Sequence, residues 1–359
     1  MIKVIVDDKI PYIKGEIEKL ADEVVYADGK DISAAMVKDA DALIIRTRTH
    51  VNRQLLEGSK VRFVATATIG FDHIDTKYCQ EAGIEWRNAP GCNATSVLQY
   101  VQSSLILLHQ QCGLALEGGR LGVVGVGHVG SQVADTEDAL GLEILRCDPP
   151  RADRGEEGFV TLQELCEQCD VISFHTPLTY DGPYPTWHLA DERFFQSLKR
   201  PIYLINTSRG EVVDNNALLR ALQEGRVKEA VIDVWEDEPN INRELLERAF
   251  IGTPHIAGYS ADGKANATRM ALDAFCEFFH LKGDYVITPP VPAQTSLEAN
   301  SNNEIQLMVY NPMEDSQRLK AAPETFEYLR EHYPLRREWR AYNLRINFGK
   351  NCHLEVPSH

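Results

Sequence analysis

The ten residues LGVVGVGHVG, numbered 121–130, constrain the fold of this chain more than any other segment. Three glycines stand at positions 125, 127 and 130, after an apolar β-branched run and before a helical pattern. Gly125 permits a tight turn, Gly127 lets the backbone approach a pyrophosphate, and Gly130 lets the helix pack closely on the strand. Because the first amide groups of such a helix face the phosphates, the segment predicts a dinucleotide-binding unit. The alternative is a nucleotide-free α/β domain with a tight turn.

An acidic residue follows the next predicted strand, LEILRC (142–147). Asp148 comes about 20 residues after the glycines, where a carboxylate can accept hydrogen bonds from a ribose diol. The same carboxylate would repel a 2′-phosphate, which favours NAD over NADP. Arg151 and Arg154 follow closely and keep NADP open as an alternative.

Alternating strand and helix patterns run through most of the chain and predict parallel sheets. Strands are predicted at 2–6, 42–46, 61–66, 121–125, 142–147, 170–174, 202–206, 229–234 and 250–253. Helices are predicted at 12–20, 95–109, 217–225 and 262–283. A proline-rich polar stretch after residue 283 reads as a linker, and the tail beyond it as a small α+β module. The fold class is therefore α/β, with two Rossmann-like doubly wound parallel-sheet domains and a small α+β C-terminal domain.

Net charge and cysteine usage exclude several classes of function. The formal net charge of -16 leaves no basic excess for nucleic acid or an anionic membrane surface, so neither is expected as a partner. No stretch approaches the ~18 apolar residues of a membrane span. The eight dispersed cysteines suit a reducing cytoplasm. Cys166 and Cys169 form a lone C-x-x-C, which reads as a helix end, so we predict no metal site.

Three candidates for catalysis follow successive predicted strands. Arg209 follows 202–206, Glu238 follows 229–234 and His255 follows 250–253. The carboxyl ends of parallel strands are where open α/β sheets bind ligands. An arginine can clamp a carboxylate, and a histidine oriented by a glutamate can accept a hydroxyl proton. Taken singly, they could be a surface arginine, a turn glutamate and a packed histidine, but together with the glycine segment they suit oxidation of an alcohol beside a carboxylate.

Four stretches together resemble the D-2-hydroxyacid dehydrogenases: GVGHVG…CD, INTSRGEVVDNNAL, DVWEDEP and TPHIAGYS. The resemblance covers about residues 1–285 and implies a split architecture. Residues 1–95 and 256–285 would form a substrate-binding lid domain, 96–255 an NAD-binding Rossmann domain, and 286–359 a dimerisation domain. CDPPRADRG (147–155) and the C-terminal module resemble a branch of the family that acts on a phosphorylated sugar acid.

The resemblance also implies roles for individual residues. Arg209, Glu238 and His255 would be the active-site residues, with His255 as proton acceptor or donor. The implied NAD contacts are Gly125, Gly127, His128, Val129, Gly130, Asp148, Thr176, Thr207, Ser208, Arg209, Asp233 and Gly258. The implied substrate contacts are Thr47, Thr68 and Tyr259.

A phosphorylated substrate needs a second cation besides Arg209. Arg46 and Arg48, in IIRTRTH, are clustered arginines in an acidic chain, so we predict that they bind the phosphate. The partner subunit's Arg336 or the partner subunit's Arg337 would assist in a homodimer formed through the C-terminal domain. Two alternatives stay open: a dehydrogenase of phosphoglycerate, glycerate or lactate, and a non-catalytic NAD-sensing protein on the same scaffold.

Overall fold

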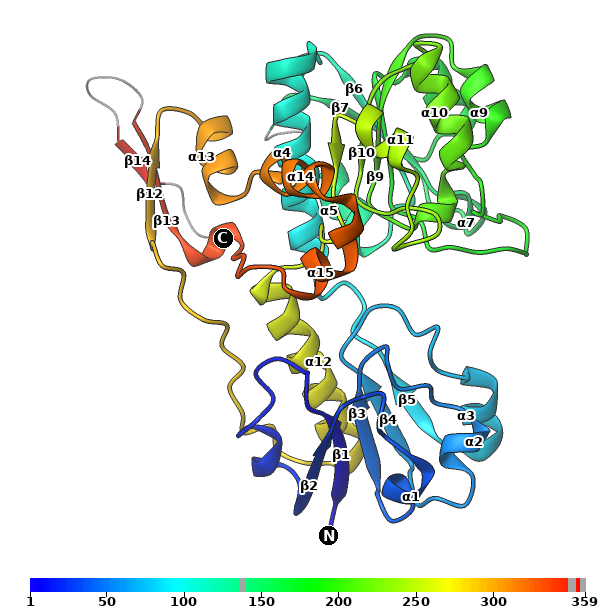
Figure 1. Cartoon of the computed structure of the whole chain (residues 1–359), viewed down its shortest axis with the longest axis vertical. Helices are drawn as coiled ribbons and strands as arrows, with labels where there is room; N and C mark the ends of the chain where they lie inside the picture. The colour runs from blue at the N-terminus through cyan, green and yellow to red at the C-terminus, as the bar shows by residue number, and fades with distance from the viewer. Residues whose placement is uncertain (136–139, 348–352, 356–359) are drawn as a thin grey trace. The chain divides into compact units, whose positions relative to one another are not determined.

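The computed structural model describes residues 1–135 and 140–347 and the backbone of 353–355 (Figure 1). The chain forms two compact units. The first unit comprises Met1–Asn93 and Ser260–Val291, and the second comprises Ala94–Tyr259 and Pro292–His359. Each unit is built from segments that are distant in the sequence.

The first unit contains a five-stranded parallel sheet in the order β2-β1-β3-β4-β5. Its strands are β1 (Lys3–Asp7), β2 (Glu23–Ala27), β3 (Ala42–Ile45), β4 (Phe63–Thr66) and β5 (Glu85–Arg87). Its helices are α1 (Ala34–Val37), α2 (Arg53–Leu56), α3 (Thr76–Ala82) and α12 (Ala261–Phe279), with the 3-10 turn η1 (Ile17–Lys19). One sheet face packs on α12 and the other on α1–α3, so the sheet is covered on both sides.

The second unit contains a six-stranded parallel sheet in the order β11-β10-β9-β8-β6-β7. Its strands are β6 (Arg120–Val124), β7 (Glu143–Cys147), β8 (Val171–Phe174), β9 (Ile202–Asn206), β10 (Val227–Ile232) and β11 (Ile251–Gly252). Its main helices are α4 (Ala94–Cys112), α5 (His128–Ala134), α7 (Pro149–Asp153), α8 (Leu162–Gln168), α9 (Glu192–Ser197), α10 (Asn215–Gln223) and α11 (Arg243–Arg248). Strand order reverses at β6, which lies between β7 and β8, and ligands of such sheets bind where the order reverses.

The C-terminal segment belongs to the second unit. It contains β12 (Ser296–Ala299), α13 (Asn302–Val309), α14 (Pro312–Ala321), α15 (Phe326–Glu331), β13 (Asn343–Asn347) and β14 (His353–Glu355), with the 3-10 turns η3 (Pro323–Thr325) and η4 (Trp339–Ala341). The strands form a small sheet in the order β12-β13-β14. Leu319 and Phe326 are fully buried in the same core as β8, β9 and α10. Figure 1 shows α14 and α15 against the body of this unit.

The predicted fold class is confirmed, and so are the long helices near 95–109 and 262–283. The helix predicted at 12–20 is wrong, because only Ile17–Lys19 forms a short 3-10 turn. Its apolar residues Ile13, Ile17 and Leu20 are buried at helical spacing, but Gly15 has φ 86° and interrupts any helix. Among the described residues, no helix is both long and apolar enough to cross a membrane.

Candidate active site

The glycine segment forms the turn from β6 into α5. At Gly125, φ is 84°, and an added Cβ would lie 2.8 Å from Thr176 Cγ2. At Gly130, an added Cβ would lie 1.9 Å from the carbonyl oxygen of Gly125, so only glycine lets α5 approach the strand this closely. At Gly127, an added Cβ would meet nothing within 4 Å. Gly125 and Gly130 are therefore required by the fold, whereas Gly127 faces open space at the start of α5.

The surroundings of that open space suit a dinucleotide. His128 and Val129 begin α5, and His128 is exposed. Thr176 Oγ1, after β8, is buried and has no hydrogen-bond partner in the described part of the chain. A buried hydroxyl without a partner is costly unless a ligand or water satisfies it. Thr176 thus fits a contact to a bound cofactor.

Asp148 lies after β7, beside the glycine turn. Its Oδ2 accepts a hydrogen bond from the Val126 amide at 2.8 Å, and its Oδ1 caps α7 through the Arg151 amide at 3.1 Å. The Arg151 side chain donates to the Val126 carbonyl oxygen at 2.7 Å and to Glu156 at 2.7 Å. Arg154 also contacts Glu156, at 3.0 Å. Both arginines are therefore engaged with protein groups, and the Asp148 carboxylate lies beside the glycine turn, where it would repel a 2′-phosphate and so favours NAD.

His175, which the sequence analysis did not single out, lies between two hydroxyl groups at the carboxyl edge of the second sheet. Its Nε2 is 2.8 Å from Ser173 Oγ and its Nδ1 is 3.2 Å from Thr207 Oγ1. Burial lowers the pKa of His175 to about 3, so the ring is neutral near pH 7. The one sequence feature that could have pointed to His175 is its place directly after the predicted strand 170–174.

Arg209 follows β9 and precedes the 3-10 turn η2 (Gly210–Val212). Asn206 holds this loop, since its Nδ2 donates to the Arg209 carbonyl oxygen and its Oδ1 accepts from the buried Ser208. The Arg209 guanidinium donates to the Ser208 carbonyl oxygen at 2.8 Å. Its other N–H groups have no protein partner among the described residues, so the fork is available to a carboxylate.

His255 and Glu238 form a close pair. His255 Nδ1 lies 2.8 Å from Glu238 Oε2, and Glu238 Oε1 accepts a hydrogen bond from the Trp235 amide at 2.9 Å. Burial alone would raise the pKa of Glu238, but the bonds from His255 and Trp235 and the charge of Arg330 lower it overall. An ionised Glu238 accepts a hydrogen bond, so the proton sits on Nδ1 of the neutral ring. Nε2 is then left with a lone pair and can accept a proton.

Asp233 shapes the loop that carries His255. Its buried carboxylate accepts hydrogen bonds from Thr253 Oγ1 at 2.7 Å and from the amides of Ile256 and Ala257 at 2.8 and 2.9 Å. The His255 amide donates to the Asp233 carbonyl oxygen at 2.8 Å, and His255 has φ 57°. Such a left-handed conformation is strained for histidine and persists only where neighbours enforce it. Burial raises the pKa of Asp233, and the charge of His255 opposes this.

Tyr259 lies one residue beyond Gly258 and is contacted by the C-terminal segment. Its hydroxyl accepts a hydrogen bond from Arg330 Nε at 3.0 Å, and its ring packs edge-on against Tyr333 at 6.1 Å between centroids. Arg330 Nη1 also lies 3.8 Å from Glu238 Oε2. Sequence reasoning missed Arg330, because it follows Tyr259 by 71 residues and stands in an ordinary amphipathic pattern.

The other predicted substrate contacts lie in the first unit. Thr47 follows β3 and Thr68 follows β4, so both stand at the carboxyl edge of neighbouring strands. Thr68 Oγ1 donates to the Gly70 carbonyl oxygen at 2.8 Å, and Thr47 is exposed. Arg46 donates to the Lys9 carbonyl oxygen at 3.2 Å.

The prediction that Arg336 helps to bind the substrate phosphate of the partner subunit is wrong. Arg336 is buried, and its guanidinium donates to the carbonyl oxygens of Ser96 and Ala257 at 2.7 and 3.2 Å. It also lies 3.5 Å from the centre of the Tyr310 ring. Arg336 therefore ties the C-terminal segment to its own chain.

The described residues contain no group of three or more His, Cys, Asp or Glu side chains arranged to hold a metal ion. Cys166 and Cys169 are buried free thiols whose pKa values are raised by burial. A raised thiol pKa means little thiolate at neutral pH, which disfavours a redox role.

The second unit matches known families along most of its length. The D-isomer specific 2-hydroxyacid dehydrogenase NAD-binding domain matches residues 97–257, and a domain of unknown function, DUF3410, matches residues 288–356. The chain is 59% identical over 344 residues to an erythronate-4-phosphate dehydrogenase of Bacteroides thetaiotaomicron, which covers 96% of this chain and 99% of that protein. An erythronate-4-phosphate dehydrogenase of Shigella flexneri is 44% identical over 350 residues, covering 94% of this chain and 92% of that protein.

Two solved structures resemble the chain over 80% of its length. A D-lactate dehydrogenase from Aquifex aeolicus complexed with NAD and lactic acid has a TM-score of 0.60 and 27% identity, and all of that chain is covered. A 3-phosphoglycerate dehydrogenase of Entamoeba histolytica with bound NAD+ has a TM-score of 0.63 and 26% identity, with 98% of that chain covered.

Proposed function

This chain belongs to the erythronate-4-phosphate dehydrogenases, among the D-isomer specific 2-hydroxyacid dehydrogenases, and we propose that it oxidises 4-phospho-D-erythronate with NAD+. The observation that carries the proposal is the 2.8 Å contact between His255 Nδ1 and Glu238 Oε2, in a unit that bears the glycine turn at its sheet edge. A base, its orienting carboxylate and a dinucleotide turn on one sheet are the parts that alcohol oxidation requires.

The proposed reaction converts 4-phospho-D-erythronate and NAD+ into (R)-3-hydroxy-2-oxo-4-phosphooxybutanoate, NADH and a proton. Bound NAD+ supplies the hydride acceptor. Arg209 binds the substrate carboxylate through the N–H groups that no described residue engages, which orients the neighbouring hydroxyl carbon. His255 Nε2 takes the hydroxyl proton as the carbonyl forms, and ionised Glu238 stabilises the resulting imidazolium.

The proposed cofactor contacts surround the carboxyl edge of the same sheet. Asp148 offers carboxylate oxygens to the ribose, and Thr176 offers its buried hydroxyl, which has no partner among the described residues. Gly127 leaves room for phosphates at the start of α5. Asp233 and Gly258 stay predicted contacts, although hydrogen bonds from the chain's own groups already occupy both carboxylate oxygens of Asp233.

We further propose a homodimer formed through the C-terminal segment, in the cytoplasm, serving pyridoxal 5′-phosphate (vitamin B6) synthesis. The small sheet β12-β13-β14 and α13 enclose a modest cluster of buried apolar residues, namely Leu297, Ala299, Ile305 and Ile346. So small a core is marginal without further cover, which supports association. Light scattering on the purified protein tests the dimer, and rescue of a bacterium that requires vitamin B6 tests the pathway.

A substrate and cofactor screen tests the activity. We expect NADH formation with 4-phospho-D-erythronate, and much slower reduction of NADP+. The comparison acids are 3-phosphoglycerate, glycerate and lactate. A preference for one of these would replace the substrate assignment, and NAD binding without turnover of any of them would favour a sensing role.

A further inference from the structure

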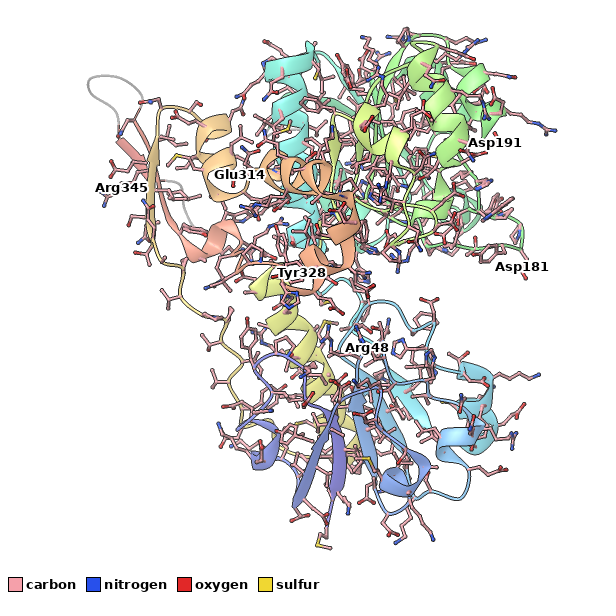
Figure 2. The ribbon with its side chains drawn as sticks, in the orientation of Figure 1. Arg48, Asp181, Asp191, Glu314, Tyr328 and Arg345 are labelled. Carbon is pink, nitrogen blue, oxygen red and sulfur yellow. The ribbon has the colours of Figure 1, made fainter. Side chains whose placement is uncertain are left out.

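The C-terminal segment places one charged side chain against the residues assigned to proton transfer. Arg330 lies on α15, whose Tyr328 is labelled in Figure 2. Its Nε donates to the Tyr259 hydroxyl at 3.0 Å, and its Nη1 lies 3.8 Å from Glu238 Oε2. The same oxygen, Oε2, faces His255 Nδ1 at 2.8 Å. Arg330 therefore connects Tyr259 with the Glu238–His255 pair.

The position of α15 is set by the core of the second unit. Phe326, at the start of this helix, is fully buried, and Leu329 packs against the same core. Tyr333, just beyond the helix, donates to Asp315 at 2.7 Å and packs on the Tyr259 ring. With apolar and polar anchors on both sides, Arg330 has little freedom to leave the site.

The electrostatic setting favours a fixed cation at this place. The charged groups that face the Arg330 guanidinium are Glu238, Tyr259 and Asp233, and they raise its pKa although burial acts in the opposite direction. Arg330 in turn helps to lower the pKa of Glu238. Its distance from Glu238 is too long for a hydrogen bond, so the effect on that carboxylate is chiefly the charge. The hydrogen bond to Tyr259 aims the guanidinium.

We propose that Arg330 is a positioning residue of the acid–base site, and that the C-terminal segment supplies it to its own chain. Arg330 keeps Glu238 ionised and aimed at His255, and it holds Tyr259 beside them. This role gives residues 288–356, the segment matched by the domain of unknown function, a part in the chemistry as well as in assembly. The proposal rests on the function assigned to His255 above.

The direction of the expected pH shift follows from the proton that the Glu238–His255 pair binds. Alcohol oxidation requires His255 to start neutral, so activity rises with pH. A neighbouring cation makes the Glu238–His255 pair release its proton more easily. Without Arg330 the pair holds that proton to higher pH, so the rising limb of the activity profile moves upward.

The test compares Arg330→Met, Arg330→Lys and Arg340→Met. Methionine removes the charge and the donors but keeps an unbranched apolar chain, whereas lysine keeps the charge without the fork. Arg340 lies in the same segment and is exposed, so it controls for loss of an arginine. Thermal unfolding and NAD binding by fluorescence show whether each variant keeps its fold.

We expect Arg330→Met to lower kcat/KM about 10- to 100-fold and to move the rising limb up by roughly half to one pH unit. Arg330→Lys should restore the pH profile and only part of kcat/KM. NAD binding should stay within about twofold in every variant, because no NAD contact is removed. If Arg330→Met kept the wild-type pH profile, or if Arg330→Lys shifted it as far as methionine does, the proposal would be wrong.

A readout without turnover separates this proposal from the function on which it rests. The ring resonances of His255, followed by NMR against pH, should titrate at higher pH in Arg330→Met than in the unaltered protein. A shift of the His255 titration without activity toward any of the tested acids would refute the assigned substrate but support the role of Arg330. Activity toward 4-phospho-D-erythronate with identical titration curves in both proteins would support the assigned substrate and refute the role of Arg330.

Discussion

At the scale of single residues, the chemistry of this site depends on which nitrogen of His255 carries the proton. Glu238 receives the Trp235 amide on one oxygen and faces His255 with the other. Despite burial, which would raise it, the pKa of Glu238 is lowered by these hydrogen bonds and by the charge of Arg330, so Glu238 is an ionised carboxylate and both oxygens are acceptors. This arrangement leaves Nε2 as the base, and His255 alone could not select that tautomer.

Glu238→Gln tests this argument with almost no change of shape. The amide oxygen would stay with the Trp235 N–H, so the amide NH2 would face His255 Nδ1. The ring would then carry its proton on Nε2, where the base is needed. We expect kcat to fall on the order of 100-fold, measured at saturating substrate and NAD+.

Glu236→Gln is a matched control, because Glu236 forms a similar pair with His188, at 2.6 Å between Oε1 and Nε2. It should keep kcat within about twofold, since neither residue is assigned to the reaction. Equal losses in the two variants would mean that both half-buried glutamate–histidine pairs of this unit matter only for folding.

Tyr259 adds a second residue-scale prediction. Its hydroxyl accepts a hydrogen bond from Arg330, and a tyrosine hydroxyl is also a donor suited to an anionic oxygen of the substrate. Tyr259→Phe should raise KM about 5- to 30-fold and leave the dissociation constant of NAD within about twofold. Tyr333, whose ring packs against that of Tyr259, provides a control. Tyr333→Phe should lower stability, because the hydrogen bond to Asp315 is lost, and should leave KM unchanged. The assignment of Tyr259 fails if the two variants change KM alike.

At the scale of elements, the turn from β6 into α5 separates what the fold needs from what a cofactor needs. Gly130→Ala would place a Cβ 1.9 Å from the Gly125 carbonyl oxygen, so backbone must shift. Gly127→Ala meets no atom within 4 Å. We expect Gly130→Ala to cost about 2 kcal/mol or more of unfolding free energy, as overpacking does, and Gly127→Ala to cost less than about 1 kcal/mol.

NAD affinity completes this comparison. Gly127→Ala should weaken NAD binding at least about tenfold while the thermal transition stays in place, because its methyl group enters the space proposed for phosphates. Calorimetric titration with NAD+ and thermal unfolding measure both quantities on the same samples. Unchanged NAD binding in Gly127→Ala would move the phosphates away from this turn.

In the first sheet, the strands predicted from sequence are those that are almost fully buried. The strands at 2–6, 42–46 and 61–66 are confirmed, because each is buried on both faces and therefore reads as an apolar run. β2 and β5 were missed. They are the two edge strands of the first sheet and are partly exposed. β5 is short and has no apolar run, whereas β2 has the apolar run VVYA and could have been predicted.

The same reasoning explains what the sequence could show of the site. Arg209, Glu238 and His255 follow strands, so topology alone brings them to one sheet edge. Arg330 comes from a helix 71 residues beyond Tyr259, and nothing in its local pattern marks it. Contacts made by packing between distant segments are available only from the fold.

At the scale of the whole molecule, a net charge of -16 has to coexist with a proposed substrate that carries a carboxylate and a phosphate. The first unit holds Arg46 and Lys264 near each other, and the pKa of Lys264 is lowered by burial and by the charge of Arg46. The second unit holds Arg209 after β9 and Arg330 beside Glu238. The first unit therefore brings two cations together against the overall charge. The phosphate role of Arg46 stays a prediction.

The acid response of the whole molecule should depend partly on His175. The pKa of this ring falls to about 3 in the folded chain, whereas an unfolded histidine titrates near ~6.5. Between these values the unfolded state binds more protons, so this contribution to stability is complete above about pH 6.5 and is lost as the pH falls toward 3. His175→Gln retains hydrogen-bonding groups toward Ser173 and Thr207 but cannot titrate.

We therefore expect the stability advantage of the unaltered protein over His175→Gln to shrink by about 1–3 kcal/mol between about pH 7 and about pH 4. The full pKa difference would give more, but His175 is partly exposed, and solvent reduces the effect. Urea unfolding at the two pH values measures the difference directly. A difference that stays constant would mean that His175 takes up its proton within the folded chain, and the fall in stability at low pH would then belong to the carboxylates.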